Sequence, residues 1–233
     1  MVAFTITPSR AAARLNSGVS PHMKYFRSFY SVELGAAYAA ALPALQEKLS
    51  CIDFACRSSD FGIAGNTFRA YRGWGIRPSI VYREWAASVC SSLDPDSLAT
   101  QICSEHGFQS WHLILSESLQ NYWVTRQGKP LSFAHQHKLV DLFVKWLSSH
   151  DFETPKFSNA LVANANCALD SQTLCKLNEC LSYALPMSSP RMGDIRSETT
   201  YTFCQNVISD FARTHGGTRL LFDYFAWRSG GGG

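Results

Sequence analysis

The sequence predicts an all-α protein, a compact globule of about eight or nine helices. Three observations lead to this prediction. Of the 233 residues, 46% are apolar and 13% aromatic, which is enough for one sizeable core. Apolar residues recur three and four positions apart along most of the chain, which is the spacing of a buried helix face. Val2 to Thr7 alternate as in one short strand, but no two strand-like segments are joined by a hairpin signal.

The chain before residue 131 is predicted to form four helices, each with a start or stop signal. These helices cover residues 29–49, 78–93, 95–106 and 109–127. Pro43 is expected to kink or end the first helix, whereas Pro78 suits the first turn of the second. Gly107 and Gly128 are expected to end the third and the fourth, because glycine readily adopts the left-handed conformation that ends a helix.

The chain after residue 131 contains four further helical patterns and a final apolar segment. They cover residues 132–150, 155–164, 170–181, 197–215 and 220–227. Ser132, Asp170 and Ser197 stand where a side chain caps the first turn of a helix. The last segment fits either a short helix or an extended strip, and a loop rich in serine and proline precedes residue 194.

We expect one helical domain over residues 1–229. It can divide into two lobes, about 1–107 and 108–229, with a cleft between them. The terminal glycines, Gly230 to Gly233, have the composition of an added tail and are left out of this expectation. The net charge of +3 comes from 21 basic and 18 acidic residues, which excludes nucleic-acid binding by charge density alone. We expect a monomer.

Several sequence features bear on location and on metals. No apolar stretch reaches the about 20 residues of a membrane-spanning helix, so we expect a cytoplasmic protein with no membrane partner. The first 32 residues contain no acid, which is also typical of a transit peptide or of a basic arm that contacts a partner. The eight cysteines form no CxxC pair and are expected to be reduced core residues. His135 and His137 would lie on different sides of a helix, so we predict no metal and no cofactor.

Residues 61–78 form the first segment that can carry chemistry. The segment holds four glycines, three arginines and four aromatic residues, and no acid occurs between Asp60 and Glu84. Arginines that alternate with aromatic rings can contact phosphates and stack on an exposed base. The alternative is an ordinary surface loop in which Phe68, Tyr71 and Trp74 pack on the core.

Two further segments are ambiguous when each is taken alone. Residues 131–150 form an amphipathic helix on which Lys138, Asp141, Leu142 and Lys145 share one face, and such a face is ordinarily solvated, with one ion pair. In residues 167–177, Asp170 precedes a helical pattern, so capping alone explains an aspartate at this position.

Taken together, these two segments resemble the helix-hairpin-helix DNA glycosylase superfamily. QHKLVDLFVKWL is similar to its lysine helix and ALDSQTL to its aspartate-capped helix. Within the superfamily, the pair is closer to the archaeal-type 8-oxoguanine DNA glycosylases, where the lysine and the aspartate have a similar separation (here 170 − 138 = 32 residues). The resemblance covers about residues 108–181. It departs from the family in two places: the hairpin glycines just before the lysine are missing, and Ala168 stands where proline is frequent.

The resemblance implies a DNA glycosylase, with an accompanying AP lyase activity, that acts on double-stranded DNA. The excised base would be an oxidised purine such as 8-oxoguanine, or a hypermodified base of phage DNA in a defence role. Lys138 would attack the anomeric carbon as the free amine, which partial burial on an apolar helix favours. Asp170, held at a helix N-terminus, would stabilise the sugar as it acquires oxocarbenium character. Lys156 is the alternative nucleophile.

A base that leaves the duplex needs a pocket with aromatic and apolar walls. The residues that we expect to serve it are Trp74, Phe133, Phe143 and Trp146 as the wall, Gln136 as a reader of the base edge, and Arg72 and Arg191 as phosphate contacts. Two other classes of function stay open. One is a non-enzymatic helical nucleic-acid-binding module, and the other is a nucleic-acid enzyme in which Asp and His residues hold a metal.

Overall fold

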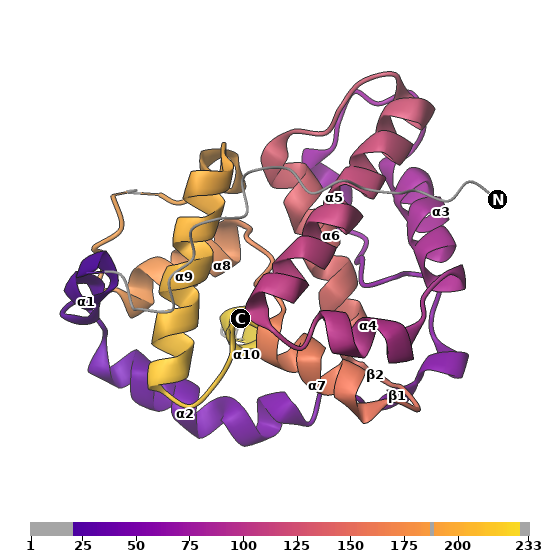
Figure 1. Ribbon diagram of the computed structural model, residues 1–233. Helices are drawn as coiled ribbons and strands as arrows, with labels where there is room; N and C mark the ends of the chain where they lie inside the picture. The colour runs from indigo at the N-terminus through magenta and orange to yellow at the C-terminus, as the bar shows by residue number, and fades with distance from the viewer. Residues whose placement is uncertain (1–20, 187–188, 229–233) are drawn as a thin grey trace.

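The computed structural model describes residues 21–186 and 189–228 and has an all-α fold (Figure 1). Its ten α-helices are α1 (Pro21–Arg27), α2 (Val32–Gln46), α3 (Pro78–Ser91), α4 (Pro95–Gln101), α5 (Glu105–Gln127), α6 (Phe133–Ser148), α7 (Pro155–Asn164), α8 (Ser171–Cys180), α9 (Glu198–Thr214) and α10 (Arg219–Arg228). The expected strand at residues 2–7 lies outside the described residues.

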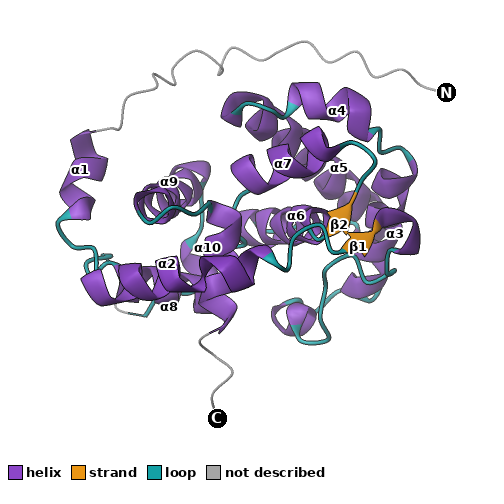
Figure 2. Cartoon of the chain, turned by 90° about the horizontal axis from the view of Figure 1, so that it is seen from below, coloured by secondary structure: helices purple, strands orange, loops and turns teal. Residues whose placement is uncertain are grey.

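The remaining regular elements are short (Figure 2). Strands β1 (Ile52–Asp53) and β2 (His150–Asp151) form one parallel pair, which joins the chain after α2 to the chain after α6. The 3₁₀ helices are η2 (Phe54–Cys56), η3 (Thr67–Ala70) and η4 (Met192–Asp194). The strand pair was not predicted, because two residues are too few to produce a recognisable alternation.

The three predicted N-caps and the predicted stop at Gly128 are confirmed. Such ends are predictable because they depend only on residues that are close in the sequence. The side chains of Ser132, Asp170 and Ser197 accept hydrogen bonds from backbone N–H groups in the first turns of α6, α8 and α9. Gly128 ends α5 in the left-handed conformation, with φ of 72°.

Pro43, expected to kink or end its helix, lies in the last turn of α2, which continues to Gln46. The predicted helix end at Gly107 is wrong. Gly107 does not end a helix but lies in the first turn of α5. A Cβ at this glycine would stand 1.8 Å from the carbonyl oxygen of Gln101, so glycine allows the end of α4 to approach α5 closely.

Two hydrophobic clusters divide the molecule into two lobes (Figure 1). The first lobe is built on residues 50–165 and contains α3 to α7; the second is built on residues 21–49 and 166–228 and contains the other helices. The expected division at residue 107 does not match these clusters. Helix α5 packs on α3 and α6, while α2 crosses to pack on α8 and α10. Helix α10 also packs against α7, so it joins the two lobes.

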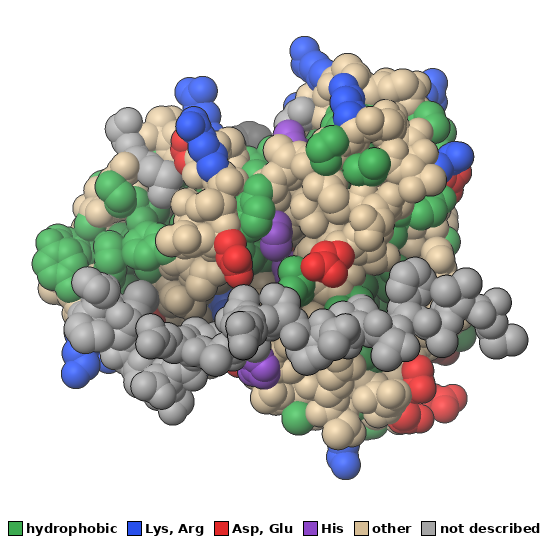
Figure 3. All heavy atoms as spheres, turned by 45° about the horizontal axis from the view of Figure 1, so that its top comes forward, with side chains coloured by type: hydrophobic (Ala, Val, Ile, Leu, Met, Phe, Trp, Pro, Cys, Tyr) green, Lys and Arg blue, Asp and Glu red, His purple; other side chains and the backbone are tan. Residues whose placement is uncertain are grey.

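The surface between the lobes is hollowed on the face seen in Figure 3, with histidine side chains in the hollow. Lysine and arginine side chains gather at the outer tips of both lobes on this face. No helix in the described ranges combines the length and the apolar character needed to cross a membrane.

All eight cysteines are free thiols. The buried ones are Cys90, Cys167, Cys180 and Cys204, and the exposed ones are Cys51, Cys56, Cys103 and Cys175. The expectation of core cysteines is therefore correct for half of them.

Candidate active site

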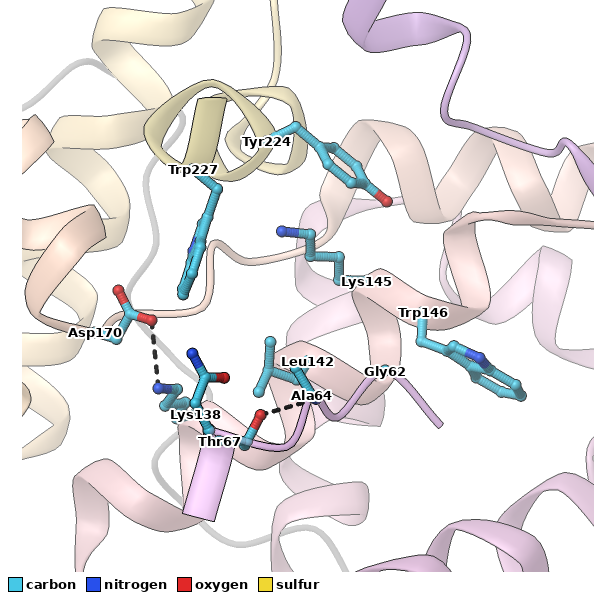
Figure 4. A pocket seen from close by; sticks show the side chains of 11 residues that line it. Gly62, Ala64, Thr67, Lys138, Leu142, Lys145, Trp146, Asp170, Tyr224 and Trp227 are labelled. Atoms are coloured by element: carbon cyan, nitrogen blue, oxygen red, sulfur yellow. Dashed lines mark hydrogen bonds and ion pairs between the residues drawn. The ribbon is translucent and has the colours of Figure 1, made fainter. Parts of the chain in front are cut away.

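Lys138 and Asp170 lie together, although they come from different lobes. The Lys138 Nζ is 3.3 Å from the Asp170 Oδ2, and the two side chains are only 13% and 11% exposed. Lys138 is in the second turn of α6, and Asp170 is the N-cap of α8. The Asp170 Oδ1 accepts a hydrogen bond of 3.0 Å from the Thr173 N–H. One carboxylate oxygen is thus fixed by the helix, and the other faces the lysine (Figure 4).

This pair lies on the wall of a pocket of about 400 Å³. Four parts of the chain form the wall: the loop before η3, one face of α6, the N-cap of α8 and the end of α10. The lining residues are Gly62, Ala64, Asn66, Thr67, Lys138, Leu142, Lys145, Trp146, Asp170, Tyr224 and Trp227 (Figure 4). The face of α6 that carries Lys138 and Lys145 is therefore a pocket wall, not an ordinary solvated face.

A second lysine in the pocket is held as a cation. The Lys145 ammonium forms an ion pair with Asp223, a residue of α10 with 0% exposure, and lies 4.3 Å from the Tyr224 ring centroid. The Asp223 Oδ2 also accepts a hydrogen bond of 2.7 Å from the Ala168 N–H. Burial by itself would lower the pKa of Lys145, but the charge of Asp223 outweighs it and the pKa is raised. Lys145 is consequently protonated at neutral pH and is unsuited to act as a nucleophile.

Aromatic side chains provide the apolar part of the wall. Trp146 lines the pocket as expected, whereas Tyr224 and Trp227 of α10 were missed. Figure 4 shows the Trp227 ring in the space between Asp170 and Lys145. Its residue is 43% exposed, so the ring lies at the open side of the pocket.

The other three aromatic candidates are not in the pocket. Phe143 is 0% exposed and packs between Trp85 and Trp146 in the core of the first lobe. Phe133 packs on His137, with ring centroids 4.1 Å apart, and Trp74 packs edge-on against the core residue Trp123. None of these three rings lines the pocket that holds Lys138 and Asp170.

The remaining predicted contacts also lie elsewhere. Gln136 does not line the pocket. Its amide donates to the Ser116 carbonyl at 2.8 Å and accepts from Gln120 at 3.1 Å, which fixes α6 to α5. Arg72 and Arg191, the predicted phosphate contacts, are exposed and lie outside the pocket lining. Lys156, the alternative nucleophile, is exposed at the start of α7 and is also outside the pocket.

The segment over residues 61–78 fits the ordinary-loop interpretation, and its first part also lines the pocket. Phe68, Tyr71 and Trp74 pack against the core of the first lobe, as in an ordinary loop. The residues just before them, from Gly62 to Thr67, form one side of the pocket. Gly62 has φ of +82°, and a Cβ there would stand 2.7 Å from the Leu142 carbonyl oxygen and from the Trp146 Cβ. Glycine therefore lets this loop lie directly on α6.

We expect Gly62→Ala to lower the free energy of unfolding by about 1–3 kcal/mol, because both the backbone conformation and the contact with α6 become strained. Urea unfolding followed by circular dichroism measures the change. Gly65→Ala is the matched control: no atom lies within 4 Å of its Cβ position, so its effect should stay within about 0.5 kcal/mol. Equal effects of the two substitutions would contradict the proposed close approach.

A buried polar network connects α6 to two neighbouring helices. The Asp141 carboxylate lies 2.8 Å from the His112 Nε2 and accepts a hydrogen bond of 2.8 Å from the Tyr201 hydroxyl. Burial raises the pKa of Asp141, and the hydrogen bonds oppose this effect. The network connects α5, α6 and α9, and so ties the two lobes together behind Lys138. Asp141 is thus part of the lobe interface and not of a solvated helix face.

His137 makes the stability of the fold sensitive to acid. Burial, with a smaller contribution from His112, lowers the pKa of His137 from its ordinary 6.5 to about 3. Between these two values the unfolded chain binds a proton that the folded chain does not, so the free energy of unfolding falls as the pH falls. The slope from this group is about 1.4 kcal/mol per pH unit.

We therefore expect His137→Gln to flatten the decline in melting temperature between pH 6.5 and pH 4, as measured by differential scanning fluorimetry. The same substitution at the exposed His106 should leave the profile unchanged. Superimposable profiles for wild type and His137→Gln would show that this histidine does not titrate differently in the folded state.

Comparison of the chain with models of protein families, with curated proteins and with solved structures gave no match. Within the described residues, no three His, Cys, Asp or Glu side chains are grouped so that they could hold a metal ion.

Proposed function

We propose that this protein is a DNA glycosylase that excises a modified base from double-stranded DNA, with Lys138 as the nucleophile and Asp170 as the stabilising carboxylate. The observation that carries the proposal is the contact of 3.3 Å between Lys138 and Asp170 on the wall of an open pocket. The same two residues carry the sequence resemblance to the glycosylase superfamily. An amine and a fixed carboxylate beside an aromatic pocket are the groups that cleavage of an N-glycosidic bond requires.

In the first step, the Lys138 amine forms a bond to C1′ of the extruded nucleotide. The C1′–N bond breaks, and the base leaves with the bonding electrons and takes up a proton. The Lys138 ammonium must first give up one proton, and the Asp170 carboxylate is the acceptor nearest to it. Asp170 passes this proton on to the departing base, so it is again a carboxylate as positive charge develops on the sugar, and its other oxygen stays bonded to the first turn of α8.

The covalent product explains the proposed lyase activity. Opening of the sugar ring converts the C1′ adduct of Lys138 into a Schiff base. Loss of a proton from C2′ then expels the 3′ phosphate by β-elimination, and water hydrolyses the Schiff base to return the free lysine.

The cation in the pocket favours particular bases. Lys145 is held by Asp223 beside Tyr224, and its ammonium can donate a hydrogen bond to a carbonyl oxygen or a ring nitrogen. Trp146 and Trp227 offer apolar surface for the base. A base rich in acceptor oxygens, such as an oxidised purine, fits this chemistry, and so does a hypermodified phage base with added polar groups.

A screen of modified DNA tests the proposal. Duplexes of one sequence, each with a different modified base and with 8-oxoguanine among them, and phage genomic DNAs are incubated with the protein and analysed for abasic sites. We expect base release from at least one substrate, and Lys156→Ala should retain it. Binding without release from every substrate would favour the non-enzymatic binding module, and release that EDTA abolishes would favour the metal enzyme.

A further inference from the structure

Two groups of exposed cations neighbour residues that line the pocket. The first group is Arg69 and Arg72, at and just beyond η3, the element whose start at Thr67 lines the pocket. The Arg72 Nε donates to the Arg69 carbonyl at 3.3 Å, which holds the Arg72 side chain against the end of η3. Neither arginine forms an ion pair with any residue that the structure describes.

The second group is Lys48 and Arg228. The Lys48 Nζ lies 5.5 Å from the ring centroid of Tyr224, which lines the pocket. Arg228 follows Tyr224 by four residues on α10, so the two side chains share one face of the helix. Both cations are exposed.

The pocket residues next to the two groups are on opposite sides of the pocket. Figure 4 shows Thr67, which leads into the arginines of η3, across the pocket from Tyr224 and Trp227. The acidic neighbours are Glu47, next to Lys48, and Asp60, whose Oδ1 already accepts hydrogen bonds from Ser58 and from the Gly62 N–H.

We infer that one nucleic-acid strand crosses the mouth of the pocket and that its phosphates on the two sides of the extruded nucleotide bind these two groups of cations. This inference rests on the proposed function for the identity of the nucleotide in the pocket. A single mononucleotide carries too few phosphates to engage both sides, whereas a continuous strand has one phosphate on each side of every nucleotide. The exposed Trp227 ring between the groups adds a surface on which a base can stack.

Binding of unmodified duplex DNA tests the inference, because it does not depend on base release. The dissociation constant is measured by fluorescence anisotropy between about 50 and 200 mM salt for wild type, Arg69→Ala/Arg72→Ala and Lys48→Ala/Arg228→Ala. Each double variant should reduce the slope of log K against log salt by about 1.8, or about 0.9 for each lost phosphate contact. The control is Arg83→Ala/Lys156→Ala, which removes the same charge from exposed positions outside the pocket. Circular dichroism melting shows whether every variant is folded.

The outcomes separate this inference from the proposed function. A reduced slope for both pocket-mouth variants, with the control unchanged, supports the strand path even if no substrate releases a base. Wild-type slopes for both variants overturn the path, and they do so even if the protein proves to be a glycosylase. Equal losses for the control and for the pocket-mouth variants also overturn it, since they would indicate unspecific attraction by net charge. In a competition experiment, a mononucleotide that displaces the labelled duplex as well as unlabelled duplex does, at equal phosphate concentration, would show a single phosphate site instead of a strand path.

Discussion

Lys138→Ala is expected to abolish the covalent adduct that borohydride traps between the protein and a duplex with an abasic site. The exposed C1′ aldehyde of such a duplex forms a Schiff base with the nucleophilic amine, and borohydride reduces this imine to a stable amine. An abasic site makes the result independent of which base the protein excises. Removal of the nucleophile should also slow base release by a factor of roughly 10³ or more, because the covalent route disappears.

The control for this prediction is Lys156→Ala, which removes an exposed lysine outside the pocket and should form the adduct as wild type does. Denaturing gel electrophoresis of the reduced samples distinguishes the variants. An adduct that survives in Lys138→Ala and is lost in Lys156→Ala would transfer the nucleophile to α7. An adduct that survives in both would mean that neither lysine is required.

Asp170→Asn is expected to reduce the rate of base release by a factor on the order of 10² to 10³ while the melting temperature stays close to that of wild type. Asparagine is about as good an N-cap as aspartate, so the hydrogen bond to the Thr173 N–H is kept. The substitution removes the negative charge that would face the sugar. Asp170→Ala should lose the charge and the cap together, with a further cost of about 1 kcal/mol in the free energy of unfolding.

The matched control is Asp94→Asn, the same substitution at the N-cap of α4, where the carboxylate also accepts a hydrogen bond from the first turn. This variant should change neither the rate of base release nor the melting temperature. Single-turnover kinetics and thermal unfolding of both variants give the comparison. A large loss of stability in Asp170→Asn with little change in rate would mean that this aspartate serves only as a cap.

The fold was predictable wherever a structural feature depends on neighbouring residues. The cap at Ser132 depends on one hydrogen bond within the first turn of α6, and the stop at Gly128 depends on one backbone conformation that glycine favours. Both can be predicted from the residue type and its place in the helical pattern. Gly107 was misread because its role depends on the carbonyl of Gln101 in another helix. Two lobes were expected, but their boundary could not be placed for the same reason, since α2 packs on α8 and α10, which are distant in the sequence.

The candidate site was predictable in part. The approach of Lys138 to Asp170 was expected only from the resemblance, because no periodicity relates α6 to the cap of α8. The position of Lys145, seven residues after Lys138, was a usable signal that both line the same surface. Asp223 and Trp227 could not be found from local patterns, since their roles depend on how α10 docks between the lobes. Phe143 looked suitable for a wall by residue type, but packing against α3 buries it.

Mass spectrometry of the trapped adduct tests the central claim most directly. The wild-type protein is reduced with borohydride on abasic-site DNA, digested with nuclease and protease, and searched for the peptide that carries the sugar remnant. The remnant should be on the ε-amine of residue 138, in the peptide that begins α6. A remnant on Lys145, on Lys156 or on the N-terminal amine, with residue 138 unmodified, would contradict the assignment of the nucleophile.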